Sequence, residues 1–168
     1  MIISGFAGIG KTYLGNKYDD IIDLESSDYK WIYSDEVNGM DREKRKGLTE
    51  RLFNPDWPEN YINAILEAEK KYKIVLISQS VEILAELRLR KIPFIVVIPD
   101  INLKEEYIAR CRKRGNNEVF IGFISDYYEY FINKLMSKDD PKVILKSGEY
   151  LEDVLIKEGY YKEREDGL

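Results

Sequence analysis

The sequence begins with an apolar run that leads directly into a glycine-rich segment, and this combination constrains the fold more than any other feature. Residues 1–4 are Met-Ile-Ile-Ser, and residues 5–12 match the phosphate-binding pattern GxxxxGK[ST] without a mismatch. This order is typical of a strand, a phosphate-binding loop (P-loop) and the start of a helix. It therefore predicts nucleotide binding, although a glycine-rich turn can also fit so short a pattern by chance.

The residue types in this segment suit a bound polyphosphate. Gly5, Gly8 and Gly10 allow positive φ and close backbone approach, so successive N–H groups can point into one concavity. The start of the following helix adds partial positive charge, the Lys11 ammonium can reach the β- and γ-phosphates, and the Thr12 hydroxyl can ligate Mg²⁺. The predicted nucleotide-binding residues are Gly5, Ala7, Gly8, Ile9, Gly10, Lys11, Thr12 and Tyr13.

Composition predicts one ordinary globular domain spanning residues 1–168, since 44% of the residues are hydrophobic and 34% are charged. The net charge is −5 and basic residues are interspersed with acidic ones, so a duplex nucleic-acid partner is not favoured. The sequence has no run of roughly 20 apolar residues, so no membrane span is expected.

Two residue counts narrow the chemistry. A single cysteine, Cys111, excludes an intramolecular disulfide and fits a cytoplasmic location, and we expect it to be a packed residue rather than a nucleophile. The absence of histidine removes the usual neutral-pH general base and the commonest zinc ligand. Acid–base chemistry would therefore fall to carboxylates.

Apolar runs predict five strands that alternate with helices. The strands are expected at residues 1–4, 21–24, 73–78, 93–98 and 142–146. This alternation predicts an α/β fold with three α/β/α layers around a parallel sheet, and the right-handed crossover rule leaves few topologies for it. Residues 162–168 are expected to form a frayed charged tail.

Capping patterns and helical spacing predict where helices begin and which faces they bury. Capping boxes are expected at Asp56 with Glu59 and at Asn102 with Glu105. The inner edge of a helix over residues 81–91 is predicted to carry Val81, Leu84, Ala85 and Leu87 or Arg88. In a helix over residues 117–136, a stripe is predicted to face the core, formed by Phe120, Ile124, Tyr127, Phe131 and Leu135.

Residues 34–55 are weakly periodic and rich in charge. The segment is interpreted as a solvated helix or mobile loop. The alternative is a substrate-facing flap in which Arg42, Arg45 or Arg51 holds an anionic acceptor.

In layout the chain resembles the nucleotide-kinase group of P-loop proteins, which includes nucleoside and nucleoside-monophosphate kinases and shikimate-kinase-like relatives. Small P-loop proteins of phages and low-GC Gram-positive bacteria look similar. The resemblance covers nearly the whole chain but is specific in residues only at residues 5–12. It implies a P-loop NTPase fold with the strand order 2-3-1-4-5, an acceptor-binding segment at about 31–61 and a helical lid at about 100–118.

The resemblance also implies roles for individual residues. Lys11 would stabilise the transferring phosphoryl group, and Thr12 would hold Mg²⁺. Asp23-Leu24-Glu25 resembles an Asp-x-Asp pair in shikimate-kinase-like members, in which one acid acts on the metal's water shell and the other on the acceptor hydroxyl. A competing alignment, with polynucleotide-kinase-like members, places Asp28 and Lys30 at the acceptor, and simple helix capping is the remaining alternative for these acids.

The later part of the chain adds candidate lid and base-binding residues. Arg110 and Arg114 lie one helical turn apart and resemble the lid arginines that close over phosphates, although a solvated basic helix face would read the same way. The adenine would lie near residues 147–150. The third strand ends in Ser78 rather than an acid, which disfavours a motor ATPase and favours phosphoryl transfer.

These features together predict a cytoplasmic, Mg²⁺-dependent kinase that uses ATP. It would transfer the γ-phosphoryl group to a small acceptor, for which a nucleoside or nucleotide is the leading candidate. The alternatives are a polynucleotide-kinase-like enzyme acting on a nucleic-acid hydroxyl and a regulatory module that binds ATP or GTP without transfer. The choice between ATP and GTP, the acceptor and the oligomeric state stay open.

Overall fold

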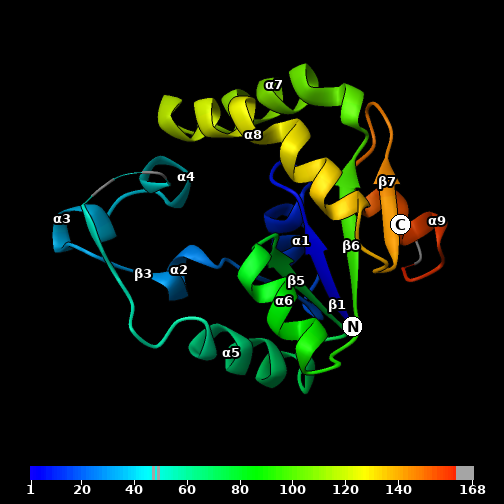
Figure 1. The fold of residues 1–168 in the computed structure, drawn as a ribbon, viewed down its shortest axis with the longest axis horizontal. Coiled ribbons are helices and arrows are strands. Elements are labelled where there is room, and N and C mark those ends of the chain that lie inside the picture. Colours follow the sequence, from blue (N-terminus) through cyan, green and yellow to red (C-terminus); the bar gives the residue numbers. More distant parts are fainter. Residues whose placement is uncertain (47, 49, 162–168) are drawn as a thin grey trace, which may run out of the picture.

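The structure, a computed structural model, describes residues 1–46, 48 and 50–161 and is built around a parallel sheet (Figure 1). Its strands, in spatial order, are β2 (Ile21–Leu24), β5 (Ile74–Ser78), β1 (Ile2–Gly5), β6 (Phe94–Pro99) and β7 (Lys142–Leu145). All neighbouring pairs are parallel. The predicted strand order 2-3-1-4-5 is therefore confirmed, and β1 delivers the glycine-rich segment at the centre of the sheet.

Helices cover both faces of this sheet. They are α1 (Lys11–Lys17), α5 (Glu59–Glu69), α6 (Val81–Leu89), the 3₁₀ helix η1 (Ile101–Leu103), α7 (Lys104–Arg114), α8 (Glu118–Met136) and α9 (Leu151–Lys157). Right-handed crossovers place α1 on one face and α5, α6 and α8 on the other. Helix α9 joins α1, since Lys17 Nζ lies 2.8 Å from Glu152 Oε1. This is the predicted three-layer P-loop fold.

The segment between β2 and α5 projects away from the main sheet (Figure 1). It contains α2 (Ser27–Lys30), α3 (Asp35–Asn38), α4 (Arg42–Arg45) and an antiparallel pair of strands, β3 (Trp31–Tyr33) and β4 (Arg51–Phe53). This strand pair was not predicted, because strands of three residues are too short to show an alternating pattern.

Two predicted capping boxes are wrong. Helix α5 begins at Glu59 without a side-chain cap, and Asp56 contributes only its carbonyl oxygen, which accepts from Asn60 N at 3.0 Å. At the second position the Asp100 carboxylate accepts from Asn102 N at 2.9 Å and starts η1. Three-residue spacings of polar side chains also occur in turns, so the pattern misplaced both helix starts.

The buried faces of two helices also differ from the prediction. Helix α6 buries Ile83, Leu84 and Leu87, while Val81 and Ala85 are exposed. Helix α8 buries Ile121, Ile124, Tyr128, Ile132 and Leu135. Tyr127 is 47% exposed and Phe120 and Phe131 are only partly buried, so the predicted stripe is rotated from the core-facing one.

Three further predictions can be placed. Cys111 is buried against Ile108 and Ile121, as expected for a packed residue. Among the described helices, none has the length and apolar character needed to cross a membrane. The predicted charged tail, residues 162–168, lies outside the described residues.

Close packing at the end of β1 generates a stability prediction. A Cβ at Gly5 would meet Ile9 Cδ1 at 2.5 Å and Lys11 Cδ at 3.0 Å, and Ile9 is fully buried and has no free space to move into. We expect Gly5→Ala to lower the free energy of unfolding by about 1–3 kcal/mol in urea titrations. Gly122→Ala is the control, because its Cβ meets nothing within 4 Å and the helix should gain about 0.5–1 kcal/mol. Equal stability of Gly5→Ala and the wild type would contradict this packing.

Candidate active site

The glycine-rich loop between β1 and α1 has the shape of an anion-binding cup. Gly8 and Gly10 have φ values of 82° and 98°, a region in which side chains with a Cβ are strained. Gly5 does not have positive φ, contrary to expectation, and is needed instead because Ile9 packs against it. Ile9 anchors the loop: its side chain is buried in the core and its carbonyl accepts from Leu151 N at 2.9 Å.

Lys11 lies at the centre of the site. Its ammonium donates to the carbonyl oxygens of Gly5 at 2.9 Å and Phe6 at 3.1 Å, and no carboxylate of the described residues forms an ion pair with it. Burial lowers the pKa of Lys11, and the charges of Asp23 and Glu25 partly oppose that shift. A buried ammonium held only by carbonyl oxygens is well suited to receive a phosphate oxygen.

Thr12 and Asp23 form a pair of oxygen donors beside Lys11. The Thr12 hydroxyl donates to Asp23 Oδ2 at 2.7 Å, while Asp23 Oδ1 is buried without a hydrogen-bond partner among the described residues. No cluster of three or more acidic, histidine or cysteine side chains that could enclose a metal occurs in the described part of the chain. The pair fits Mg²⁺, which typically takes one or two protein oxygens and fills its other positions with water and phosphate.

Glu25 occupies the next position at the carboxyl ends of the strands. Its Oε1 accepts from Ser78 Oγ at 3.2 Å, and its Oε2 lies 3.1 Å from Lys46 Nζ. The Glu25 carboxylate, which directly follows β2, therefore lies at the end of β5. Burial alone would raise the pKa of Glu25, but Lys46 and Lys11 outweigh it and lower the pKa from its usual 4.5 to about 2.

Asp28 is not brought into this group. It forms ion pairs with Arg42, at 3.0 Å, and with Arg45, so two of the three predicted flap arginines hold an acid of the chain itself. Lys30 lines the cavity beside the loop but is paired with Glu82 at 3.1 Å. The structure therefore groups Asp23 and Glu25 with Lys11 and leaves Asp28 outside the cavity lining.

Both predicted lid arginines line the cavity. Arg110 donates to the carbonyl oxygens of Gly8 at 3.3 Å and Glu149 at 3.0 Å, and its guanidinium lies 4.0 Å from the centre of the Tyr150 ring. Arg114 Nε lies 3.2 Å from Glu43 Oε2. Arg110 thus already reaches the phosphate-binding loop, and Arg114 contacts the opposite segment.

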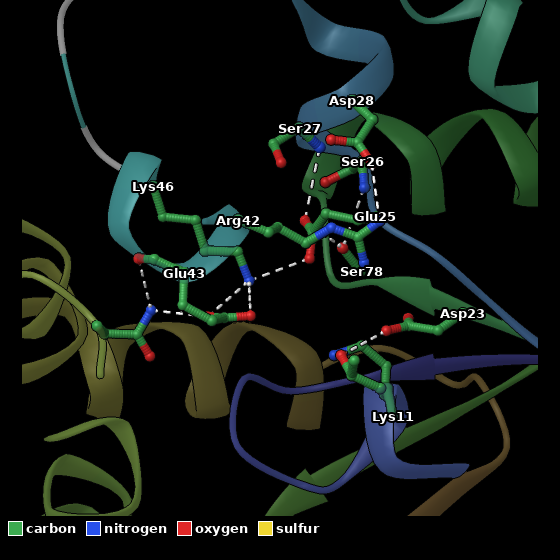
Figure 2. Close-up of polar contacts among 12 residues, drawn as sticks. Lys11, Asp23, Glu25, Ser26, Ser27, Asp28, Arg42, Glu43, Lys46 and Ser78 are labelled. Carbon is green, nitrogen blue, oxygen red and sulfur yellow. Dashed lines mark hydrogen bonds and ion pairs between the residues drawn. The ribbon is translucent and has the colours of Figure 1, made fainter. Parts of the chain in front are cut away.

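Sequence reasoning missed Glu43 and Lys46, which connect that segment to the rest of the site. The Lys46 ammonium lies between Glu25 and Glu43 (Figure 2), 3.1 Å from Glu25 Oε2 and 3.3 Å from Glu43 Oε2. Asn116, between α7 and α8, donates to Glu43 Oε2 at 2.8 Å. Within a run of charges, neither residue carries a local signal of this role, because their partners are distant in sequence. We call Glu43, Lys46, Arg114 and Asn116 the bridge.

These groups surround one cavity of ≈1060 Å³, which is large enough for a nucleotide and a second small molecule. Its lining includes most of the predicted nucleotide-binding residues, namely Gly5, Ala7, Gly8, Gly10, Lys11, Thr12 and Tyr13. Tyr150, from the segment predicted to lie near adenine, lines it as well. Ile9 does not, because its side chain points into the core.

No family model matches this sequence, and no curated protein sequence matches it. Among solved structures, the tunicamycin resistance protein of Deinococcus radiodurans is similar, with a TM-score of 0.48 and 14% sequence identity. The similarity spans 94% of this chain and 95% of that one. The site is therefore interpreted from its own geometry.

The Lys46 contact generates a titration prediction. The pKa of Glu25 is lower in the folded chain than in the unfolded chain. The ionised carboxylate therefore contributes to the free energy of unfolding above about pH 4.5, and this contribution is lost as the pH falls toward 2. Replacing Lys46 by Met should raise the Glu25 pKa by roughly one unit or more, measured by ¹³C NMR of the carboxyl carbon. Lys70→Met, which removes a surface partner of Glu67, should leave it unchanged. An unshifted Glu25 pKa in Lys46→Met would show that the ion pair is absent.

Proposed function

We propose that this single domain is a Mg²⁺-dependent kinase that transfers the γ-phosphoryl group of ATP to a hydroxyl of a small acceptor, a nucleoside or nucleotide in the first instance. The observation that carries the proposal is the Lys11 ammonium, which is buried beside a glycine cup and the Thr12–Asp23 pair and has no ion pair with any carboxylate in the part of the chain that the structure describes. The cavity beside it has room for both substrates.

The loop residues would bind and orient the donor. Backbone N–H groups near Gly8 and Gly10 and the start of α1 favour the phosphates, and Lys11 stabilises the charge on the transferring group. Thr12 and Asp23 would hold Mg²⁺, which supplies charge neutralisation between the phosphate oxygens. The ring of Tyr150 offers a stacking surface for the base.

Glu25 is better suited to orient the acceptor hydroxyl than to remove its proton. A carboxylate with a pKa of about 2 is a weak base at neutral pH, whereas it remains a strong hydrogen-bond acceptor. In phosphoryl transfer, positioning and electrostatic stabilisation provide most of the rate enhancement. Glu25 therefore acts mainly by alignment in this proposal.

The arginines of α7 would complete the donor site. Arg110 Nη2 lies 2.6 Å from Glu106 Oε1, and this ion pair would hold the guanidinium while its contact with the Gly8 carbonyl is exchanged for a phosphate oxygen. Closure of residues 100–118 as a lid, which the bridge would draw toward the segment at 31–61, is part of this proposal.

Two other functions are less well supported. A polynucleotide-kinase-like reaction through Asp28 and Lys30 would have to break their ion pairs with Arg42, Arg45 and Glu82. A regulatory module that binds ATP or GTP without transfer would need no second site, whereas the cavity extends well past the loop.

Loss of the Lys11 ammonium tests the phosphoryl-transfer role. In Lys11→Ala, transfer from γ-labelled ATP to pooled small metabolites should fall by roughly 10²-fold or more. Circular dichroism and urea unfolding should still show a folded protein. Lys17→Ala, which removes a more exposed ammonium of the same helix, should transfer label at the wild-type rate. Unfolding of Lys11→Ala would indicate a structural role, and full activity would refute the catalytic one.

The orienting role of Glu25 predicts a pH profile. With the acceptor identified from that screen, the wild-type rate should show no Glu25 ionisation between about pH 5 and 8, and Glu25→Gln should lose less than the roughly 10²-fold typical of a general base. A rate that rises with an apparent pKa near neutrality and becomes flat in Glu25→Gln would instead identify Glu25 as the base.

A further inference from the structure

Helix α8 presents an apolar wall to the cavity. Its lining residues include Val119, Phe120, Phe123 and Phe131, of which Val119 is 62% and Phe123 is 46% exposed. The rings of Phe123 and Phe131 are in contact, with centroids 5.6 Å apart. Exposed aromatic side chains that line a cavity at the carboxyl end of a parallel sheet indicate a surface that binds a ligand.

Aromatic side chains from the acceptor segment line the same cavity. They are Trp31 on β3 and Trp57 before α5, which are the two tryptophans of the chain. Trp57 stacks on Tyr61 at 5.6 Å, and its indole N–H donates to Glu82 Oε2 at 2.8 Å, so the ring is held in place and its polar atom is satisfied. A flat or apolar molecule could therefore contact aromatic surface from α8 and from the acceptor segment.

Several of the cations that line this part of the cavity are already paired with acids of the chain. Lys30 is paired with Glu82, and Lys46 and Arg114 are paired with Glu43. Arg51 has no carboxylate partner among the described residues, but its guanidinium lies 4.0 Å from the centre of the Trp31 ring. Lys113 and Lys134 also line the cavity without a carboxylate partner among the described residues, and Lys134 Nζ donates to the Tyr130 hydroxyl at 3.2 Å. An acceptor that carries its own phosphate would have to break the ion pairs or rely on Arg51, Lys113 or Lys134, whereas the donor side offers Lys11, which has no ion pair within the described residues.

A few polar atoms remain available near Glu25. The hydroxyl of Ser27 and the Oε1 of Gln79 are buried without a hydrogen-bond partner among the described residues, and both residues line the cavity. An apolar pocket with a small number of oriented polar groups is the usual form of a site that binds an apolar body and fixes one polar substituent.

We propose that the acceptor is an uncharged alcohol with an aromatic or apolar body, which packs between the α8 wall and the tryptophans while its hydroxyl faces Glu25. The inference rests on the proposed kinase function and selects an unphosphorylated acceptor within it. In the reaction the hydroxyl oxygen forms a bond to the γ-phosphorus and the bond from that phosphorus to the β–γ bridging oxygen breaks. ADP leaves with that electron pair, and the hydroxyl proton passes to solvent.

Equilibrium binding tests this inference, and the two tryptophans provide the fluorescence signal. The full chain is saturated with Mg²⁺ and a non-hydrolysable ATP analogue, so that the loop is filled, and two matched pairs are titrated. One pair is 4-phenylbutan-1-ol and its phosphate ester, and the other is adenosine and adenosine monophosphate. The uncharged member of at least one pair should bind saturably, and the phosphorylated member of that pair should bind with an affinity lower by roughly tenfold or more.

Matched variants on α8 test the wall itself. Phe123→Ser should weaken binding of the alcohol by roughly fivefold or more through lost apolar contact. Tyr127→Ser is the control, because Tyr127 is 47% exposed on the same helix but does not line the cavity. This variant should bind the alcohol with the affinity of the wild type.

Three results would overturn the inference. The first is that either phosphate ester binds more tightly than its alcohol, especially if Arg51→Met abolishes that preference. The others are that neither alcohol binds saturably, or that Phe123→Ser binds the alcohol as tightly as the wild type does. Failure of the ATP analogue to bind would refute the proposed kinase function separately. The same alcohols and variants, titrated on the nucleotide-free protein, would then decide whether the apolar site exists.

Discussion

Burial of the Lys11 ammonium against the carbonyl oxygens of Gly5 and Phe6 is the constraint on which the site depends. Removing an ammonium from water without a carboxylate partner is unfavourable, and the fold tolerates it by surrounding Lys11 with oriented backbone oxygens and nearby negative charge. Ile9 holds the loop in this conformation because its side chain is packed in the core. Stability of the loop and readiness for an anion thus arise from the same packing.

Contacts at the far side of the cavity connect elements that lie far apart in the chain. Lys46 joins Glu25 at the end of β2 to Glu43 on α4, and Glu43 is held in turn by Arg114 and Asn116. The bridge therefore couples the acceptor segment to the arm formed by α7 and α8. It also keeps the Glu25 carboxylate charged, which links the geometry of that segment to the chemistry at the centre.

Local pattern was sufficient to predict the sheet and the loop, and tertiary contact explains what it missed. The five main strands are short apolar runs between turn residues, and their alternation with helices predicted a parallel sheet, while the strand order came from the resemblance to P-loop kinases. Periodicity also showed that α8 has apolar faces, but it cannot distinguish a face on the core from one on a cavity, so Phe120 and Phe131, which line the cavity, were assigned to the core. Residues 5–12 could be selected from spacing, and Asp23 and Glu25 from the resemblance to shikimate-kinase-like proteins. Glu43 and Lys46 could not, because only folding brings them to Glu25.

The central claim is that the loop around Lys11 binds a magnesium nucleoside triphosphate, and calorimetric titration of the protein with ATP measures this most directly. The account predicts saturable binding of one nucleotide per chain, with an affinity that falls when Mg²⁺ is removed by chelation. Absence of heat with ATP and with GTP, in the presence of Mg²⁺ and with folded protein, would contradict it.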